Sequence, residues 1–121
     1  MNQKILWVDD IRNPFKIMKF GTECSWVLDF YQAKNMLDNR QDFTAIYLDN
    51  DLGSETAPQG KDVLLVIEEM LFNNLLPYLD AIYLHSDNAS AVNGMLSAKE
   101  NFRERYGVDI IRHTLSRSAY N

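Results

Sequence analysis

The sequence predicts an α/β fold built on a parallel five-stranded sheet, and two patterns lead to this prediction. Five short apolar runs alternate along the chain with amphipathic segments of helical period. The runs are apolar at consecutive positions, as is typical of strands that crossover helices bury. With 121 residues, of which 46% are hydrophobic and 24% charged, the chain has the size and composition of one globular domain, taken as residues 1–121.

The first half of the chain contains three of the predicted strands. Residues 4–8 form a β-rich apolar run that ends in two acids, and residues 24–28 form a weaker second strand. Apolar residues at helical spacing then predict a helix over residues 29–39. Residues 44–48 are the third strand, and a dense apolar face over residues 61–71 predicts a largely buried helix after it.

The same alternation continues to the end of the chain. Residues 81–84 are the fourth predicted strand. A single helix is predicted over residues 90–106, because its apolar residues fall on one stripe, and Gly107 is placed to cap its C-terminus. Residues 108–111 form the fifth strand, and the short remainder leaves little sequence for a further helix.

Charge, hydropathy and cysteine content narrow the class of protein. The net charge is −5, and an acidic chain lacks the basic face that duplex nucleic acid requires, so we expect no duplex DNA footprint. No apolar run reaches the length of about 18 residues that a membrane span needs, so we expect no membrane association. Cys24 has no second cysteine for an internal disulfide, which favours a reducing, cytoplasmic location.

Acidic residues follow the first and third predicted strands. Asp9 and Asp10 end the first strand, and Asp49 and Asp51 follow the third. Because the carboxyl ends of parallel strands meet at one edge of a sheet, we expect these acids to converge. Carboxylates this close repel one another unless some protonate or a cation binds, and hard oxygen ligands favour Mg²⁺ or Mn²⁺. We therefore predict a metal site, with solvated helix-capping acids as the alternative.

Further polar residues are expected at the same edge. His85, Ser86 and Asn88 follow the fourth strand, and Arg12 comes two residues after the first acid pair. A neutral imidazole transfers protons near neutral pH, so His85 is a candidate general acid or base. Ser86, Asn88 and Arg12 are candidates for holding a phosphate. The alternatives are a half-buried structural histidine, a helix-capping serine and a surface arginine.

These strand-end residues resemble those of the response-regulator receiver domain. In that family the acid after the third strand accepts a phosphoryl group beside Mg²⁺. By position, Asp49 matches that acid, Asp9 and Asp10 the metal-binding pair, and Ser86 the hydroxyl residue. The resemblance implies a receiver-like (flavodoxin-like) three-layer sandwich with strand order 2-1-3-4-5. The last helix of that fold is expected to be short or missing here.

Four blocks in order give a finer resemblance to a divergent branch, the cyclic-phosphate processing receiver-like domain (cREC). They cover roughly residues 4–95 and read Asp9-Asp10-Ile11-Arg12-Asn13-Pro14, Leu48-Asp49-Asn50-Asp51-Leu52-Gly53, Gly60-Lys61-Asp62-Val63-Leu64 and His85-Ser86-Asp87-Asn88. The resemblance implies hydrolysis of a cyclic phosphate, such as an RNA 2′,3′-cyclic end or a cyclic nucleotide, with RNA repair as a setting. It implies a phosphate-containing small molecule or an RNA end as partner.

In this interpretation the four acids hold Mg²⁺ or Mn²⁺, and His85 and Asp49 are catalytic. The chain departs from both patterns, since Asn50 stands where the cREC pattern has His. The fifth strand ends in Arg112 and His113 where signalling receivers have Lys followed by Pro, and alternation sends only one of the two into the crevice. A second function therefore stays open, a non-enzymatic stand-alone receiver that is phosphorylated on Asp49 or acts by binding a protein partner.

Overall fold

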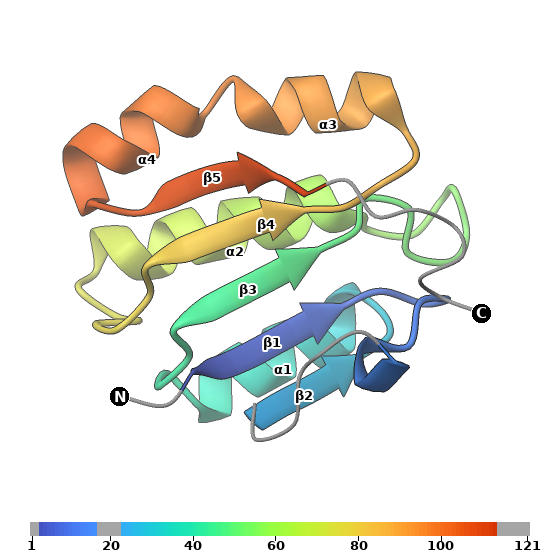
Figure 1. Cartoon of the computed structure of the whole chain (residues 1–121), viewed down its shortest axis with the longest axis horizontal. Coiled ribbons are helices and arrows are strands. Elements are labelled where there is room, and N and C mark those ends of the chain that lie inside the picture. Colours follow the sequence, from blue (N-terminus) through green and yellow to red (C-terminus); the bar gives the residue numbers. More distant parts are fainter. Residues whose placement is uncertain (1–2, 17–22, 114–121) are drawn as a thin grey trace.

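Five parallel strands form one sheet in the order β2-β1-β3-β4-β5 in the computed structural model of the chain (Figure 1). The structure describes residues 3–16 and 23–113. This is the α/β architecture that the sequence predicts and the strand order that the resemblance to receivers implies. The strands are β1 (Lys4–Val8), β2 (Glu23–Val27), β3 (Ala45–Leu48), β4 (Ala81–Leu84) and β5 (Asp109–Arg112).

Within the described residues, four α-helices and one short 3₁₀ helix connect the strands. They are η1 (Pro14–Lys16), α1 (Phe30–Asn39), α2 (Gly60–Phe72), α3 (Ala89–Leu96) and α4 (Lys99–Tyr106). Asp29 caps α1, since its carboxylate accepts a hydrogen bond from the Gln32 amide at 2.8 Å. Gly107 caps α4 as predicted, with a left-handed φ of 67°. None of these helices is long and apolar enough to cross a membrane.

The prediction of one helix over residues 90–106 is wrong, because the segment breaks between α3 and α4. The Ser97 hydroxyl donates to the Gly94 carbonyl at 2.6 Å. The amides of Ser97 and Ala98 bond to carbonyls three residues earlier, a tightened turn that ends α3. Met95 and Phe102 both reach the core across the break, so the apolar stripe does not reveal it.

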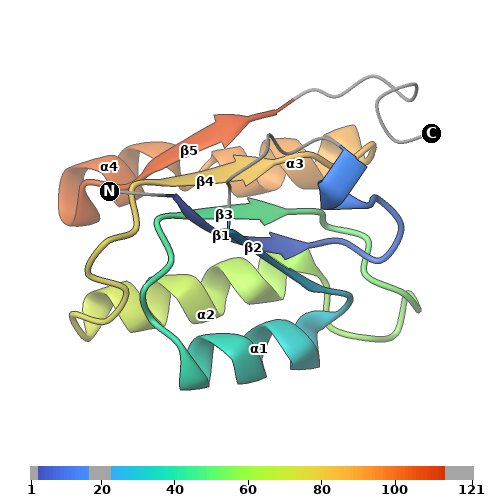
Figure 2. The same cartoon turned by 60° about the horizontal axis from the view of Figure 1, so that its bottom comes forward.

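The four α-helices bury their apolar side chains in one core, which they share with one face of the sheet. Figure 2 shows α1 and α2 lying below the strands. The sheet residues of that core include Leu6, Val8, Ile46, Leu48, Ile82 and Leu84. The described residues thus supply one helical layer. The second helical layer of the predicted three-layer sandwich is not found among the described residues. The predicted short or missing last helix would follow residue 113, which lies outside the described part of the chain.

The opposite face of the sheet carries a row of aromatic rings. Trp26, Trp7, Tyr47 and Tyr83 are register partners on adjacent strands. The Tyr47 ring stacks on Trp7 with centroids 5.0 Å apart and on Tyr83 at 4.5 Å. The His113 ring lies edge-on to both tyrosines. In β1, β3 and β4, stacked aromatic rings therefore cover the sheet face that lies away from the helices.

Candidate metal site

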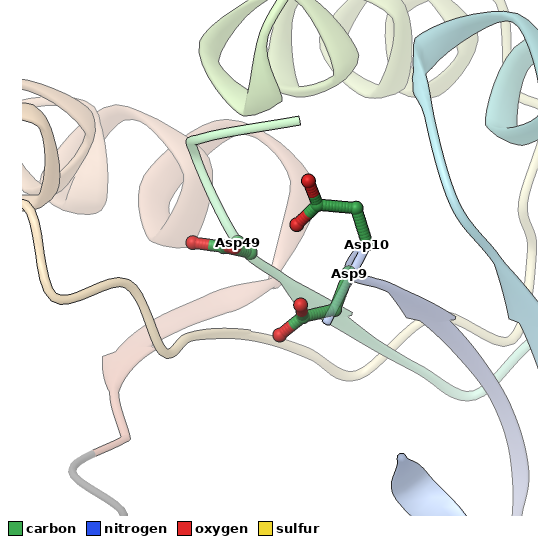
Figure 3. Close-up of side chains that lie close together, drawn as sticks. All are labelled: Asp9, Asp10 and Asp49. Atoms are coloured by element: carbon green, nitrogen blue, oxygen red, sulfur yellow. The ribbon is translucent and has the colours of Figure 1, made fainter. Parts of the chain in front are cut away.

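Three carboxylates gather where β1 and β3 end (Figure 3). Asp9 and Asp10 follow β1, Asp49 follows β3, and one oxygen from each lies within 4.8 Å of the other two. Asp9 and Asp49 are only 0% and 2% exposed, and Asp10 is the most accessible of the three. The predicted convergence is confirmed for these acids. Asp51 lies outside the group, and its carboxylate accepts a hydrogen bond from the Asn88 side chain at 3.4 Å.

Asp9 is held by hydrogen bonds to both of its carboxylate oxygens. Oδ1 accepts from the backbone amides of Ile11 at 2.9 Å and Arg12 at 3.1 Å. Oδ2 lies 2.9 Å from His85 Nε2 and accepts from the Arg12 guanidinium at 3.2 Å. Burial by itself raises the pKa of Asp9, but the hydrogen bonds from His85 and the two amides outweigh it and the pKa is lowered. Asp9 is therefore ionised at neutral pH, with its orientation fixed.

The pKa of Asp49 is shifted in the opposite direction from that of Asp9. Burial, and then the negative charge of Asp9, raise the pKa of Asp49 to about 7. The charge of Arg12, whose guanidinium lies 3.3 Å from the Asp49 carboxylate, and a hydrogen bond with the Ser86 side chain offset part of this increase. A bound cation relieves such a penalty, and the donors present are hard oxygens. The donor set therefore fits Mg²⁺ or Mn²⁺.

Arg12 binds three carboxylates at the edge of the acid group. Besides Asp9 and Asp49, its guanidinium reaches Asp87 at 2.6 Å, and its side chain is only 12% exposed. Burial opposes its charge, but the charges of Asp9 and Asp49 raise the pKa of Arg12. Arg12, which the sequence suggests as a phosphate ligand, thus neutralises part of the charge of the acids.

His85 lies beneath Asp9 on the aromatic face of the sheet. Its side chain is fully buried and its ring stacks on Trp7 with centroids 4.6 Å apart. It follows Leu84, whose side chain points into the core, so alternation sends the imidazole to the other face. Nδ1 has no hydrogen-bond partner among the described residues. The geometry supports a role in positioning Asp9, and direct proton transfer to a substrate stays a prediction.

Ser86, Asn88 and Asn50 form the loop side of the site. The Ser86 side chain bonds to Asp49, and its Oγ accepts from the Asn88 amide at 3.0 Å. Asn88 is the N-cap of α3. Asn50, which stands where the cREC pattern has His, is 6% exposed, and its Oδ1 accepts from the Lys61 amide at 3.2 Å. Asn50 therefore anchors the start of α2.

Arg112 and His113 are neighbours at the end of β5, and their side chains lie in different surroundings because successive side chains of a strand alternate between its two faces. Arg112 is the register partner of Leu84 and its side chain is exposed. The His113 amide donates to the Leu84 carbonyl at 2.8 Å, and its ring lies against Tyr47. Burial, and then the charge of His85, lower the pKa of His113. Neither residue belongs to the three-carboxylate group.

Gly60 is a part of the site that the sequence interpretation missed. Its amide donates to the Asn50 carbonyl at 2.8 Å. A Cβ at this position would overlap the Asp49 carbonyl oxygen and lie 2.7 Å from the Asn50 Cα. Only glycine lets α2 approach the acid-bearing loop this closely. The sequence signal was the Gly60-Lys61-Asp62-Val63-Leu64 block, which by itself gave no physical reason for the glycine.

The two tryptophans were also missed. The Trp7 indole donates to the Arg12 carbonyl at 3.0 Å, and the Trp26 indole donates to the Asp9 carbonyl at 2.7 Å. Both rings therefore hold the backbone of the loop that carries the first acid pair. No pattern in the sequence indicated this, because the contacts depend on how that loop folds over the sheet.

Comparison with known protein families gives one match. The family model described as cyclic-phosphate processing receiver domain matches residues 4–101 of the chain. The matched segment contains β1, β3 and β4 and all the carboxylates of the acid group. No curated protein and no solved structure matches the chain at a significant level.

Proposed function

The chain belongs to the cyclic-phosphate processing receiver family, and from this premise we propose that it is a divalent-metal-dependent hydrolase that opens a cyclic phosphate to a phosphomonoester. The observation that carries the proposal is the group of Asp9, Asp10 and Asp49 at the ends of β1 and β3, in which Asp9 and Asp49 are buried. When bound there, Mg²⁺ or Mn²⁺ would polarise a phosphoryl oxygen and lower the pKa of a water molecule.

The side chains around the acids have separate roles in this proposal. Asp9 offers an ionised oxygen whose direction His85 and two backbone amides fix. Ser86, whose side chain bonds to Asp49, would turn its hydroxyl to a phosphoryl oxygen when the substrate binds. In the reaction, water forms a new bond to phosphorus and the bond to one ring oxygen breaks. The proton of the water ends on that oxygen, which leaves as a hydroxyl group.

The direct test uses a short RNA with a 2′,3′-cyclic phosphate end. We expect the protein with Mg²⁺ or Mn²⁺ to convert the cyclic phosphate to a monoester, and EDTA to prevent the conversion. The measurement is ³¹P NMR after a quench with EDTA, since the two phosphates have well-separated chemical shifts. An unchanged cyclic phosphate, with metal binding verified by calorimetry, would exclude this substrate.

Variants of His85 distinguish positioning from proton transfer. We expect His85→Ala to weaken Mg²⁺ binding by about 10–100-fold, because Asp9 loses the donor that orients it. We expect His85→Gln, whose side-chain amide can replace that donor, to recover part of the affinity. The measurement is a Mg²⁺ titration by calorimetry. Wild-type affinity in both variants, together with lost turnover, would instead show that the imidazole transfers a proton.

The hydrogen bond between Ser86 and Asp49 favours a second candidate function. In signalling receivers the acid after the third strand is phosphorylated, and the sequence resemblance matches Asp49 to that acid and Ser86 to the hydroxyl residue beside it. In this alternative the chain is a non-enzymatic module that is phosphorylated on Asp49. Incubation with an acyl phosphate and Mg²⁺, followed by intact-mass analysis, tests it: a stable phosphoryl adduct that Asp49→Asn abolishes would support the module over the hydrolase.

A further inference from the structure

A groove of ≈ 770 Å³ lies between α2 and α3, beside the acid group. Asn50, the residue after Asp49, and Asn88, whose amide donates to the Ser86 hydroxyl, both line the groove. The side chains of Asn50 and Asn88 both donate to the Asp51 carboxylate, at 3.1 and 3.4 Å. The groove therefore lies next to the metal site, because Asn50 directly follows the metal-site residue Asp49 in the chain.

The lining of the groove is largely aliphatic. Its wall is formed by Leu64, Leu65, Ala91, Gly94, Met95 and Ala98. Lys61 also lines it and forms no ion pair with the residues that the structure describes. The volume lies in the range of about 300–1,000 Å³ that is typical of pockets for small organic molecules. A phosphate alone would leave most of such a groove empty.

We propose that this groove binds the nucleoside of a nucleoside 2′,3′-cyclic phosphate whose phosphate lies at the acid group. The inference rests on the proposed function and names its substrate class. A nucleobase has a flat, weakly polar face for the wall around Leu64 and Met95, and a polar edge for the exposed hydroxyl of Ser90, which also lines the groove. A polyol cyclic phosphate is polar throughout and has no group for the aliphatic wall.

Gly94 allows the groove to be filled without disturbing the fold. It lines the groove, and a Cβ built on it meets no atom within 4 Å. We expect Gly94→Leu to lower kcat/KM for adenosine 2′,3′-cyclic phosphate by about tenfold or more, because the new side chain occupies the place of the base. Hydrolysis of ethylene phosphate, a cyclic phosphate without a nucleoside, should not change. Asn93→Leu, one residue away on α3 and outside the groove, is the matched control.

Two results of this comparison would overturn the groove proposal. One is a Gly94→Leu variant that hydrolyses the nucleotide as well as the wild type does. The other is an equal loss for both substrates, which would show an effect on the metal site or on the fold. In either case the hydrolase proposal would stand, because the wild-type protein would still open ethylene phosphate.

A binding measurement tests the groove even if the chain is not a hydrolase. With Mg²⁺ present, adenosine 3′-monophosphate should shift the backbone amide signals of Leu64, Ala91 and Gly94 in ¹⁵N NMR spectra. Inorganic phosphate should shift only signals around Asp49 and Ser86. Groove signals that move without any turnover would support the groove and remove the hydrolase. Nucleotide-induced shifts confined to the acid group would overturn the groove assignment alone.

The terminal nucleoside can come from a free nucleotide or from an RNA end. Comparing adenosine 2′,3′-cyclic phosphate with a trinucleotide that ends in the same group separates these sources. If both ligands bind with equal affinity, the groove recognises the free nucleotide. If the trinucleotide binds about tenfold more tightly, the groove recognises the end of an RNA. In both cases Gly94→Leu must weaken binding, and wild-type affinity in that variant would overturn the proposal.

Discussion

Asp49→Asn is expected to stabilise the metal-free protein at pH 8 and to remove its response to Mg²⁺. The pKa of Asp49 in the folded protein, about 7, lies above its ordinary value of 3.8. The folded state thus binds this proton more tightly than the unfolded state, and the free energy of unfolding falls as pH rises from about 4 to about 7. Each pH unit between the two pKa values is worth about 1.4 kcal/mol, and asparagine carries no charge to destabilise the fold.

For Asp49→Asn we expect a gain of roughly 2–4 kcal/mol in the free energy of unfolding at pH 8, with little change at pH 4. In a domain of this size that corresponds to a rise in Tm of about 5–15 °C. Saturating Mg²⁺ should raise the Tm of the wild type, because the ion binds only the folded state, and leave that of Asp49→Asn unchanged. Thermal unfolding with and without Mg²⁺ at both pH values measures this.

Asp38→Asn is the matched control for Asp49→Asn. Asp38 pairs with Lys34 on the exposed side of α1 and lies outside the acid group. This variant removes the same charge and should respond to Mg²⁺ as the wild type does. An Asp49→Asn protein that still gains stability from Mg²⁺ would show that Asp49 is not a ligand. A lower Tm at pH 8 would show that charge repulsion does not govern this carboxylate.

Gly60→Ala is expected to cause the largest loss of stability. The new methyl group would overlap the Asp49 carbonyl oxygen and press on the Asn50 backbone, neither of which is a flexible side chain. Either α2 or the acid-bearing loop must move, and overpacking of this kind costs about 3 kcal/mol or more. Because the displaced residues include Asp49, the response to Mg²⁺ should weaken as well. Thermal unfolding measures the first effect, and a calorimetric Mg²⁺ titration measures the second.

Gly94→Ala provides the contrast for Gly60→Ala. It makes the same chemical change inside a helix, but its Cβ would meet no atom within 4 Å. We expect it to raise the free energy of unfolding by about 0.5–1 kcal/mol, since alanine favours the helix over glycine. If Gly60→Ala unfolds within 2 °C of Gly94→Ala, a difference of under about 1 kcal/mol, the close approach of α2 to Asp49 is not a constraint on the fold.

The sequence predicted the strands better than it predicted the breaks between helices. Residues 4–8 and 81–84 were placed with the correct ends, because consecutive apolar residues followed by polar ones mark a buried strand. The break between α3 and α4 was missed. It depends on the hydrogen bond of Ser97 to the Gly94 carbonyl, which a hydrophobic period does not record.

The acid group was predictable for a topological reason, and the orientation of single side chains was not. Asp9, Asp10 and Asp49 follow strands that a parallel sheet must place side by side. The contact between His85 and Asp9 follows from alternation, since both come directly after core-facing residues of their strands. The sequence interpretation did not take that step. The bond of Asn50 to the start of α2 depends on the path of the loop between β3 and α2, which no local pattern specifies.

The indole contacts give the protein a fluorescent probe of its own acid group. The chain contains two tryptophans, and both donate hydrogen bonds to carbonyls of the loop that carries Asp9. The Trp7 ring also stacks on His85, the partner of the Asp9 carboxylate. All of the tryptophan emission therefore originates within one or two contacts of the site. Occupancy by a cation or a phosphate can be followed in the unlabelled protein by the intensity and wavelength of this emission.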